Sequence, residues 1–135
     1  MTVVLVDSNV LLDLITEDSS WYSWSASAVE RISDRSRLVI NTIIYAEVSV
    51  GFARIEEVEA ALPTVLFNRE AIPDAAAFLA AKAFVAYRRR GGARRSPLPD
   101  FFIGAHAAIA GYELLTRDPL RYRSYFPSLT LIAPP

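Results

Sequence analysis

The chain starts with a short, uninterrupted apolar run, Val3–Val6, which the acidic residue Asp7 ends. A half-exposed strand alternates apolar and polar side chains, so a continuous run of this length indicates a strand buried on both faces. Helical patterns separate this run from further strand-like segments at 38–40, 64–68, 113–116 and 129–133. The alternation predicts right-handed β-α-β units and therefore a mostly parallel sheet with helices on both sides.

The same reading places helices over residues 9–15, 20–33, 42–52, 54–62, 74–87 and 100–110. Ser8, Thr42 and Asp74 stand at helix starts, where short polar side chains cap free N–H groups. The stretch 88–99 contains two glycines and two prolines and is predicted to be a loop. We expect one α/β domain over residues 1–135, with three α/β/α layers.

Composition excludes several classes of site. The chain has no cysteine, which rules out disulfides, thiol catalysis and cysteine-ligated zinc. Its net charge of −1 rules out a uniformly basic nucleic-acid binder, although a local basic patch remains compatible with that sum. No apolar stretch has the length of a membrane span, and no signal-peptide pattern is visible at the start. We expect a soluble, cytoplasmic protein.

Four acidic residues stand where predicted strands end or helices begin: Asp7, Glu47, Asp100 and Asp118. In parallel sheets ligands bind at the carboxyl ends of the strands, so these side chains are expected to share one cleft. Clustered carboxylates repel each other and need a cation, and oxygen ligands suit Mg²⁺ or Mn²⁺. Each acid also has a simpler interpretation: a turn residue at Asp7 or Asp118, a helix-dipole partner at Asp100, and a partnered charge within an apolar helix at Glu47.

The remaining titratable residues are interpreted as structural. Asp13, Asp18, Asp34 and Asp74 are assigned to solvated faces or helix caps. His106 follows Asp100 by six residues on an alanine-rich helix, which turns it about 120° away from that acid. We therefore expect His106 to be packed or to face a partner, and not to ligate a metal.

The four acids lie in the motifs Val6–Asp13, Ala46–Val48, Pro99–Ala107 and Leu115–Pro119, and Arg121–Tyr122 follows the last of them. Each motif alone is weak, but their order and spacing along essentially the whole chain resemble a PIN domain, and more narrowly the VapC toxins of bacterial type II toxin–antitoxin modules. The resemblance implies a metal-dependent endoribonuclease in which the four acids hold Mg²⁺, with Mn²⁺ as a substitute. It also implies that Asn9 and Thr116 orient carboxylates or metal-bound water.

The resemblance implies partners as well: an RNA substrate cut to leave 5′-phosphate and 3′-hydroxyl ends, a cognate VapB-like antitoxin, and a second copy of the chain in a homodimer. The antitoxin would lie in a groove between the first helices. Trp21, Tyr22 and Trp24 form an apolar stripe on the second predicted helix. The stripe is interpreted as core packing, with the antitoxin groove as the alternative.

A basic loop precedes Asp100 and contains five arginines: Arg88, Arg89, Arg90, Arg94 and Arg95. It is either a solvated connection or a phosphate contact that guides RNA into the cleft; such contacts give affinity without sequence information. Arg117, Arg121 and Arg123 lie near Asp118 and can add to this charge, although Arg117 can equally pair with an acid.

Three other functions are compatible with parts of the sequence. A non-catalytic PIN-like module that binds RNA or protein is the main alternative, and the intact set of four acids argues against it. A phosphoacceptor receiver domain needs a lysine at a late strand end, but Lys82 lies within a predicted helix. A haloacid-type phosphatase needs Asp-x-Asp after the first strand, and the second position here is Asn9.

Overall fold

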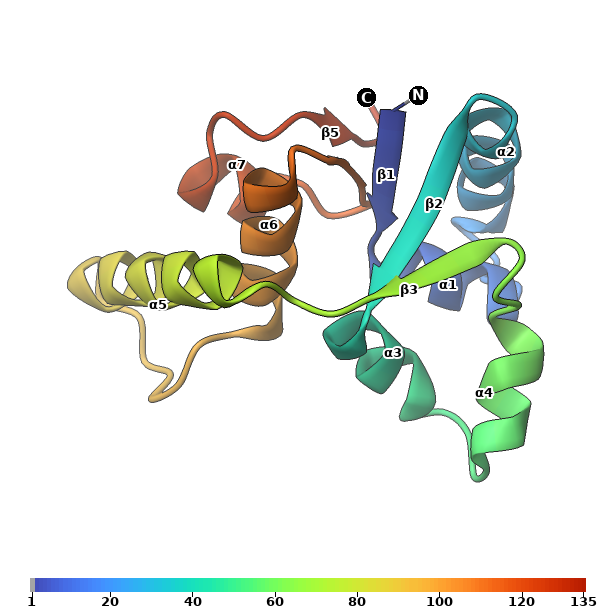
Figure 1. The fold of residues 1–135 in the computed structure, drawn as a ribbon, viewed down its shortest axis with the longest axis horizontal. Helices are drawn as coiled ribbons and strands as arrows, with labels where there is room; N and C mark the ends of the chain where they lie inside the picture. The colour runs from blue at the N-terminus through green and yellow to red at the C-terminus, as the bar shows by residue number, and fades with distance from the viewer. Residues whose placement is uncertain (1) are drawn as a thin grey trace.

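The computed structural model describes residues 2–135, in which strands and helices alternate as predicted (Figure 1). In chain order the elements are β1 (Thr2–Val6), α1 (Ser8–Ile15), α2 (Tyr22–Ser33), β2 (Ser36–Asn41), α3 (Thr42–Ser49), α4 (Ile55–Ala61), β3 (Phe67–Glu70), α5 (Asp74–Arg89), α6 (Pro99–Ala110), β4 (Glu113–Leu115), α7 (Leu120–Tyr125) and β5 (Leu131–Ile132). Among these helices, none is long and apolar enough to cross a membrane.

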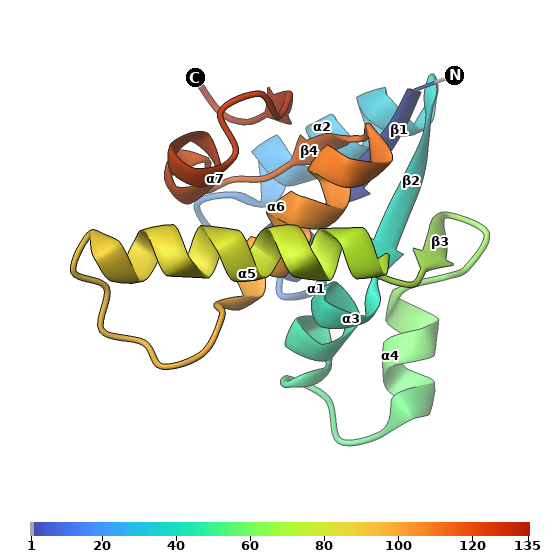
Figure 2. The same ribbon diagram turned by 60° about the vertical axis from the view of Figure 1, so that its left-hand side comes forward.

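The five strands form one sheet in the order β3-β2-β1-β4-β5, and every pairing is parallel. Helices α1 and α2 pack together on one side, while α5 and α6 pack together on the other (Figures 1 and 2). The predicted three-layer α/β/α arrangement is confirmed. The chain moves outward from β1 through β2 to β3 and then returns to β4 on the other side of β1, so the strand order reverses between β1 and β4. The crevice at such a reversal is where sheets of this kind bind ligands.

Two polar residues end a buried strand and begin a helix at the same time. Asp7 follows β1 and accepts a hydrogen bond from the Ser8 backbone N–H at 2.8 Å. Asn41 ends β2 and accepts one from the Ile44 N–H at 3.0 Å. The prediction of Ser8, Thr42 and Asp74 as the caps was wrong, because these residues are already helical and the extended backbone that a cap needs lies one position earlier.

The third strand also lies later than predicted. Residues 64–66 form a turn in which the backbone N–H groups of Leu66 and Phe67 donate to the Pro63 carbonyl, at 3.1 and 2.9 Å. Residues 64–66, which were predicted to begin the strand, therefore do not pair with the sheet, and Val65 is 95% exposed. β3 begins at Phe67, which is opposite Leu38 of β2, and continues to Glu70 at the edge of the sheet.

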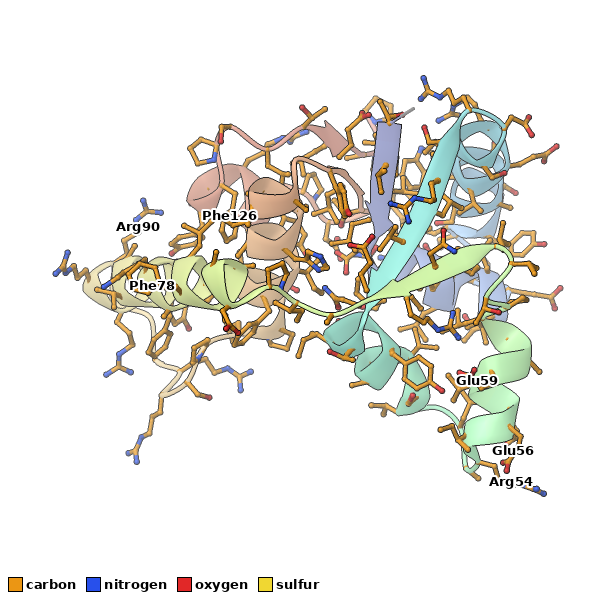
Figure 3. The ribbon with its side chains drawn as sticks, viewed as in Figure 1. Arg54, Glu56, Glu59, Phe78, Arg90 and Phe126 are labelled. Carbon is orange, nitrogen blue, oxygen red and sulfur yellow. The ribbon has the colours of Figure 1, made fainter. Side chains whose placement is uncertain are left out.

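Helix α7, which the sequence did not predict, packs against α6 at Gly104. A Cβ atom at this position would lie 2.5 Å from the ring of Phe126, at the end of α7, and 3.1 Å from the ring of Tyr122. Figure 3 labels Phe126 beside these two helices. The close approach of the two helices thus depends on the missing side chain.

Gly104→Ala is therefore expected to destabilise the protein by about 1–3 kcal/mol, although alanine is the better helix former by about 1 kcal/mol. Chemical denaturation measures this effect. Gly51→Ala is the control, because an added Cβ there meets nothing within 4 Å. Equal stability of the two variants would contradict the packing argument.

Candidate functional site

The four acids predicted from the sequence come together at the carboxyl edge of the sheet. Asp7 follows β1, Glu47 lies on α3, Asp100 lies in the first turn of α6, and Asp118 lies in the segment between β4 and α7. Neighbouring side chains connect them: the Ser8 hydroxyl donates to Glu47 at 2.8 Å and lies 3.5 Å from Asp7. The carboxyl ends of β1 and β2 point toward α1 and α3 at this edge (Figure 1).

Asn9 and Thr116 lie between two of the acids. The Asn9 Nδ2 group donates to Asp7 at 3.4 Å and to Asp118 at 3.5 Å, and its Oδ1 accepts from the Arg117 backbone N–H at 3.1 Å. The Thr116 hydroxyl donates to Asp7 at 2.9 Å and accepts from the Asp118 N–H at 3.1 Å. These contacts fix the rotamer of the Asp7 carboxylate and connect the end of β1 to the end of β4.

Burial dominates the electrostatics of Asp7, which is 3% exposed. Loss of water raises the pKa of this carboxyl from its ordinary value of 3.8 to about 6, against hydrogen bonds from Tyr122 and Thr116 that lower it. The charge of Asp100 raises the Asp7 pKa further. Asp7 therefore holds its negative charge at a free-energy cost that a nearby cation would relieve.

The pKa values of Glu47 and Asp100 are likewise raised by burial and by a neighbouring negative charge, and lowered by polar contacts. Burial raises the pKa of Glu47, the Ser8 hydrogen bond lowers it, and the charge of Asp100 raises it. Burial also raises the pKa of Asp100, the guanidinium of Arg121 lowers it, and the charge of Asp118 raises it. Like charges thus act on one another across the cluster, which is characteristic of functional sites.

The chemistry of this cluster fits a divalent cation that is bound partly through water. The acids supply hard oxygen donors, and Asp100 and Asp118 line a cleft of about 330 Å³ together with Pro119, Leu120 and Arg121. Within residues 2–135, however, no three His, Asp or Glu side chains form a group that could hold a metal ion directly. Mg²⁺ commonly keeps several waters and takes only one or two protein carboxylates, so this arrangement suits a hydrated ion.

Tyr122 is a residue of this site that the sequence reasoning missed. It lies on α7, is 1% exposed, and its hydroxyl donates to Asp7 at 2.9 Å and lies 3.5 Å from Asp100. The motif Arg121–Tyr122 was recognised, but no role was given to the tyrosine. Tyr122 and Phe126 are both buried and lie four residues apart, which is about one helical turn. This spacing in the sequence indicates one apolar helix face, and it could have predicted that the tyrosine ring is buried.

Asp13 is not a solvated residue or a cap, and that prediction was wrong. Its carboxylate is buried and accepts two hydrogen bonds from Arg117, both at 2.9 Å, and one from the Ser25 hydroxyl at 2.7 Å. The Arg117 guanidinium also lies 5.4 Å from the centre of the Trp21 ring. The ion pair joins α1, α2 and the segment after β4, so it supports the chain that carries Thr116.

His106 is packed, as expected, and contacts a different set of residues. Its Nδ1 lies 3.0 Å from Asn41 Nδ2. Because the Asn41 oxygen already accepts from Ile44, the amide must donate to the imidazole, so the neutral ring carries its proton on Nε2. That nitrogen lies 3.6 Å from a Glu70 carboxylate oxygen, and burial lowers the pKa of His106.

Of the five arginines assigned to the basic loop, Arg88 and Arg89 belong to the last turn of α5, so the loop begins at Arg90 and the predicted boundary at residue 88 was wrong. We keep the name basic loop for the group of five. Arg88 donates to the Arg94 carbonyl at 2.7 Å. Arg90, labelled in Figure 3, caps the end of α5, and its guanidinium lies 4.6 Å from the Tyr125 ring centre. Arg89, Arg94 and Arg95 are exposed, and within the described part of the chain the side-chain hydrogen bonds of this group come from Arg88 and Arg90. These three are therefore the arginines available to an anionic partner.

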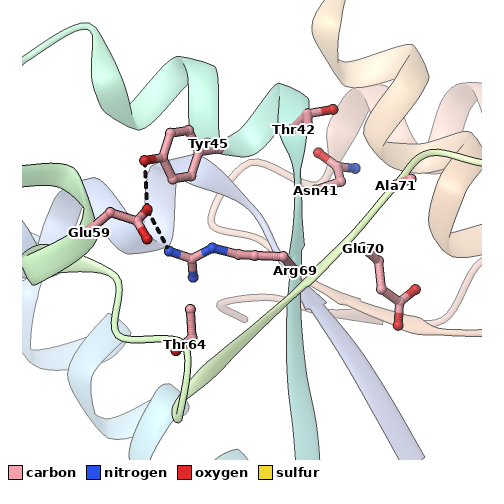
Figure 4. A pocket seen from close by; sticks show the side chains of 8 residues that line it. All are labelled: Asn41, Thr42, Tyr45, Glu59, Thr64, Arg69, Glu70 and Ala71. Carbon is pink, nitrogen blue, oxygen red and sulfur yellow. Dashed lines mark hydrogen bonds and ion pairs between the residues drawn. The ribbon is translucent and has the colours of Figure 1, made fainter. Parts of the chain in front are cut away.

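A second pocket, of about 410 Å³, lies between α3, α4 and β3 (Figure 4). The Tyr45 hydroxyl and the Arg69 guanidinium both donate to Glu59, at 2.7 and 3.1 Å, and brace one wall. None of the four acids lines this pocket, and it shares no lining residue with the acidic cleft. Pocket and cleft are therefore separate features of the surface.

Comparison with known families and structures gives a consistent result. The model of the PIN domain family matches residues 4–123. Curated protein sequences give no significant match. Similar solved structures include VapBC2 from Rickettsia felis bound to a DNA fragment from its promoter, with 16% identity, a TM-score of 0.74, and coverage of 99% of this chain and 100% of that one.

Two further structures are similar along nearly their whole length. VapBC-1 from nontypeable Haemophilus influenzae is 20% identical with a TM-score of 0.73, covering 98% of each chain. A toxin–antitoxin complex from Klebsiella pneumoniae is 25% identical with a TM-score of 0.67, covering 96% of this chain and 95% of that one. For the two VapBC structures, which are 16% and 20% identical to this chain, the similarity demonstrates a shared fold.

Proposed function

This chain belongs to the PIN domain family, as its motifs predicted, and we propose that it is a VapC-like toxin, an endoribonuclease that depends on Mg²⁺ or Mn²⁺ and is inhibited by a cognate antitoxin. The observation that carries the proposal is the convergence of four carboxylates, from four separate segments, at one edge of the sheet. Three of them, Asp7, Glu47 and Asp100, have pKa values raised by burial and by the charge of another acid of the cluster. A site that confines negative charge in this way suits a divalent cation.

The residues divide between holding a cation and orienting its ligands. Asp7, Glu47, Asp100 and Asp118 would hold the ion, directly or through water, and Asn9 and Thr116 orient two of these carboxylates through the hydrogen bonds described above. When bound, a divalent ion supplies a water of lowered pKa and neutralises charge on the phosphate. His106 is buried and bonded to Asn41, so it is not offered as a general base.

Binding of a divalent ion is the direct test of this site. Wild-type protein free of antitoxin is titrated with Mn²⁺ while the signal of free Mn²⁺ is followed by electron paramagnetic resonance. We expect saturable binding that Asp100→Asn weakens by at least about tenfold, because one charged oxygen ligand is lost. Asp34→Asn, a change at an exposed acid at the end of α2, serves as the control. Equal Mn²⁺ binding by Asp100→Asn would remove that acid from the site.

RNA would reach the acids past the basic loop, where Arg94 and Arg95 carry exposed guanidinium groups. Each phosphate contact with a single strand contributes about 0.7 to the slope of log affinity against log salt. The double variant Arg94→Ala/Arg95→Ala is therefore expected to lower that slope by about 1.4 for any RNA sequence. Filter binding at several salt concentrations measures it.

The matched control removes two exposed arginines from the far end of the molecule, Arg31→Ala/Arg35→Ala, on and just after α2. It changes the net charge by the same amount and is expected to leave the slope unchanged. A loss of slope that is equal in both double variants would show that net charge, and not the loop, attracts RNA.

The proposed antitoxin is a small VapB-like protein whose apolar C-terminal segment binds between the first helices. Tyr22 is 41% exposed on α2, and Trp21 and Trp24 beside it are partly buried, with their rings edge to face at 6.3 Å. This surface supplies an apolar contact near the Arg117 end of the acidic site. A homodimer of the toxin remains part of the proposal, as it is implied by the family.

The alternative is a non-catalytic PIN-like module that binds RNA or protein. One observation favours it: among residues 2–135, no three acidic or histidine side chains lie close enough together to bind one metal ion directly. The two functions differ in a single result, because a binding module would retain RNA without cutting it at any Mn²⁺ concentration.

A further inference from the structure

Tyr122 connects two acids, Asp7 and Asp100, that lie far apart in the sequence. Its hydroxyl is 2.9 Å from Asp7 Oδ2 and 3.5 Å from Asp100 Oδ1. A phenol has one proton, which the two carboxylates share in a three-centre hydrogen bond: Asp7 accepts the stronger part and Asp100 the weaker part. The side chain is 1% exposed, which means that water does not compete for this donor.

The position of the hydroxyl is fixed by packing on α6. Tyr122 Cδ1 lies 3.1 Å from the place that a Cβ of Gly104 would occupy. Gly104 follows Asp100 by four residues, about one helical turn, and therefore lies on the same side of α6. The missing side chain of Gly104 leaves room for the Tyr122 ring against α6, and the hydroxyl lies 3.5 Å from Asp100, one turn away.

Arg121, the residue before Tyr122 on α7, contacts the other carboxylate oxygen of Asp100. Arg121 Nη1 lies 3.8 Å from Asp100 Oδ2, while the Tyr122 hydroxyl faces Oδ1. The Arg121 side chain is 41% exposed, so this ion pair is screened by solvent. Among these two contacts, only the buried hydroxyl also reaches Asp7.

We infer that Tyr122 is a positioning residue whose buried hydroxyl holds the Asp7 and Asp100 carboxylates at one spacing, so that both face an incoming divalent cation together. The inference rests on the proposed function, because it gives the tyrosine a role in a cation site. Without the hydroxyl, Thr116 and Asn9 still hold Asp7, but the direct link from Asp7 to Asp100 is lost. The cation itself must then bring the two like charges together.

The test compares Tyr122→Phe with Tyr125→Phe in the full chain, using Mn²⁺ alone as the probe. Both variants lose one hydroxyl from α7, and the Tyr125 ring keeps its contacts with Phe101 and Arg90. Removing a group that orients metal ligands typically costs 10–100-fold in metal affinity. We expect the Mn²⁺ dissociation constant to rise by about tenfold in Tyr122→Phe and to stay unchanged in Tyr125→Phe.

Two further results separate positioning from a general structural role. At saturating Mn²⁺, the cleavage rate of Tyr122→Phe should return to that of the wild type, because the reacting groups are intact. Gly104→Ala, which displaces the tyrosine without removing its hydroxyl, should weaken Mn²⁺ binding in the same direction. A defect in folding alone would instead persist at any Mn²⁺ concentration, and circular dichroism of each variant checks for one.

The outcomes also distinguish this inference from the proposed function. If the wild type binds Mn²⁺ and Tyr122→Phe binds it equally well, the positioning role is wrong and the proposed function stands. If Tyr122→Phe binds Mn²⁺ more weakly but saturation does not restore cleavage, the hydroxyl acts in another way and the inference is wrong. If the wild type does not bind Mn²⁺ at all, the metal site fails and Tyr122 has no cation to serve.

Discussion

Asp7→Asn is expected to reduce the rate of RNA cleavage by at least about a thousandfold, which corresponds to about 4 kcal/mol of lost transition-state stabilisation. Asp7 is the most buried of the four acids and accepts hydrogen bonds from Thr116 and Tyr122. An amide at this position keeps the shape of the side chain but removes the charge that would attract a cation. Single-turnover cleavage of end-labelled RNA measures the loss, and Asp34→Asn is the control.

The same substitution should make the metal-free protein more stable at alkaline pH. The pKa of Asp7 is raised from 3.8 in an exposed chain to about 6 in the fold. The folded state therefore holds the proton more tightly, and the stability that this gives is fully present below pH 3.8 and is lost as the pH rises through about 6. The gap between the two pKa values corresponds to about 3 kcal/mol.

Asp7→Asn has no charge to bury, so at pH 8 and without metal it is expected to exceed the wild type by up to about 3 kcal/mol in the free energy of unfolding. At pH 4 the advantage should largely vanish, because Asp7 is then protonated in the folded wild type. The value is an upper limit, since the amide must turn its oxygen toward Thr116 and Tyr122. Urea denaturation at the two pH values measures the difference. An Asn variant that is less stable at pH 8 than at pH 4, relative to the wild type, would reverse the sign and refute the account of Asp7.

Asp13→Ala is expected to cause the largest loss of stability, about 3 kcal/mol or more. The change leaves the Arg117 guanidinium and the Ser25 hydroxyl without the acceptor that they share. Removing one partner of a buried ion pair costs more than the pair itself contributes, because a charge stays behind without compensation. Chemical denaturation at neutral pH gives the difference.

The control for this prediction is Asp34→Ala, which removes an exposed carboxylate at the end of α2. It is expected to change stability by less than about 0.5 kcal/mol. A double variant, Asp13→Leu/Arg117→Met, should recover much of the loss, since an apolar pair of similar size needs no charge compensation. A small effect of Asp13→Ala would show that Arg117 finds solvent or another acid without cost.

The layers of the fold and the meeting of the four acids were predictable because both follow from local patterns. An apolar run such as Val3–Val6 indicates a buried strand. In a parallel sheet the carboxyl ends of all strands lie at the same edge, so the residues that follow these ends lie near one another. Asp7 and Asp118 follow two of these strands, Glu47 lies on the helix that follows β2, and Asp100 lies at the start of the helix that leads into β4. All four positions are therefore expected at the same edge of the sheet. No knowledge of side-chain contacts was needed for that step.

What the sequence did not reveal depends on contacts between distant segments. Tyr122 meets Asp7 across 115 positions, and Asp13 meets Arg117 across 104. Periodicity within α7 indicates only that one face is apolar, and it does not indicate which acid the hydroxyl reaches. Asp13 looked solvated because its partner is an arginine far along the chain. The shift of β3 to Phe67 likewise arises from a turn at Pro63 that takes the backbone N–H groups first.

Cleavage of RNA by the purified, antitoxin-free protein, with and without Mg²⁺ or Mn²⁺, tests the central claim most directly. The account predicts discrete fragments with 5′-phosphate ends that appear only with the metal and are absent with Asp7→Asn. Cleavage that continues in excess chelator, or that Asp7→Asn performs as well as the wild type, would contradict the claim that the four carboxylates form a metal-dependent nuclease site.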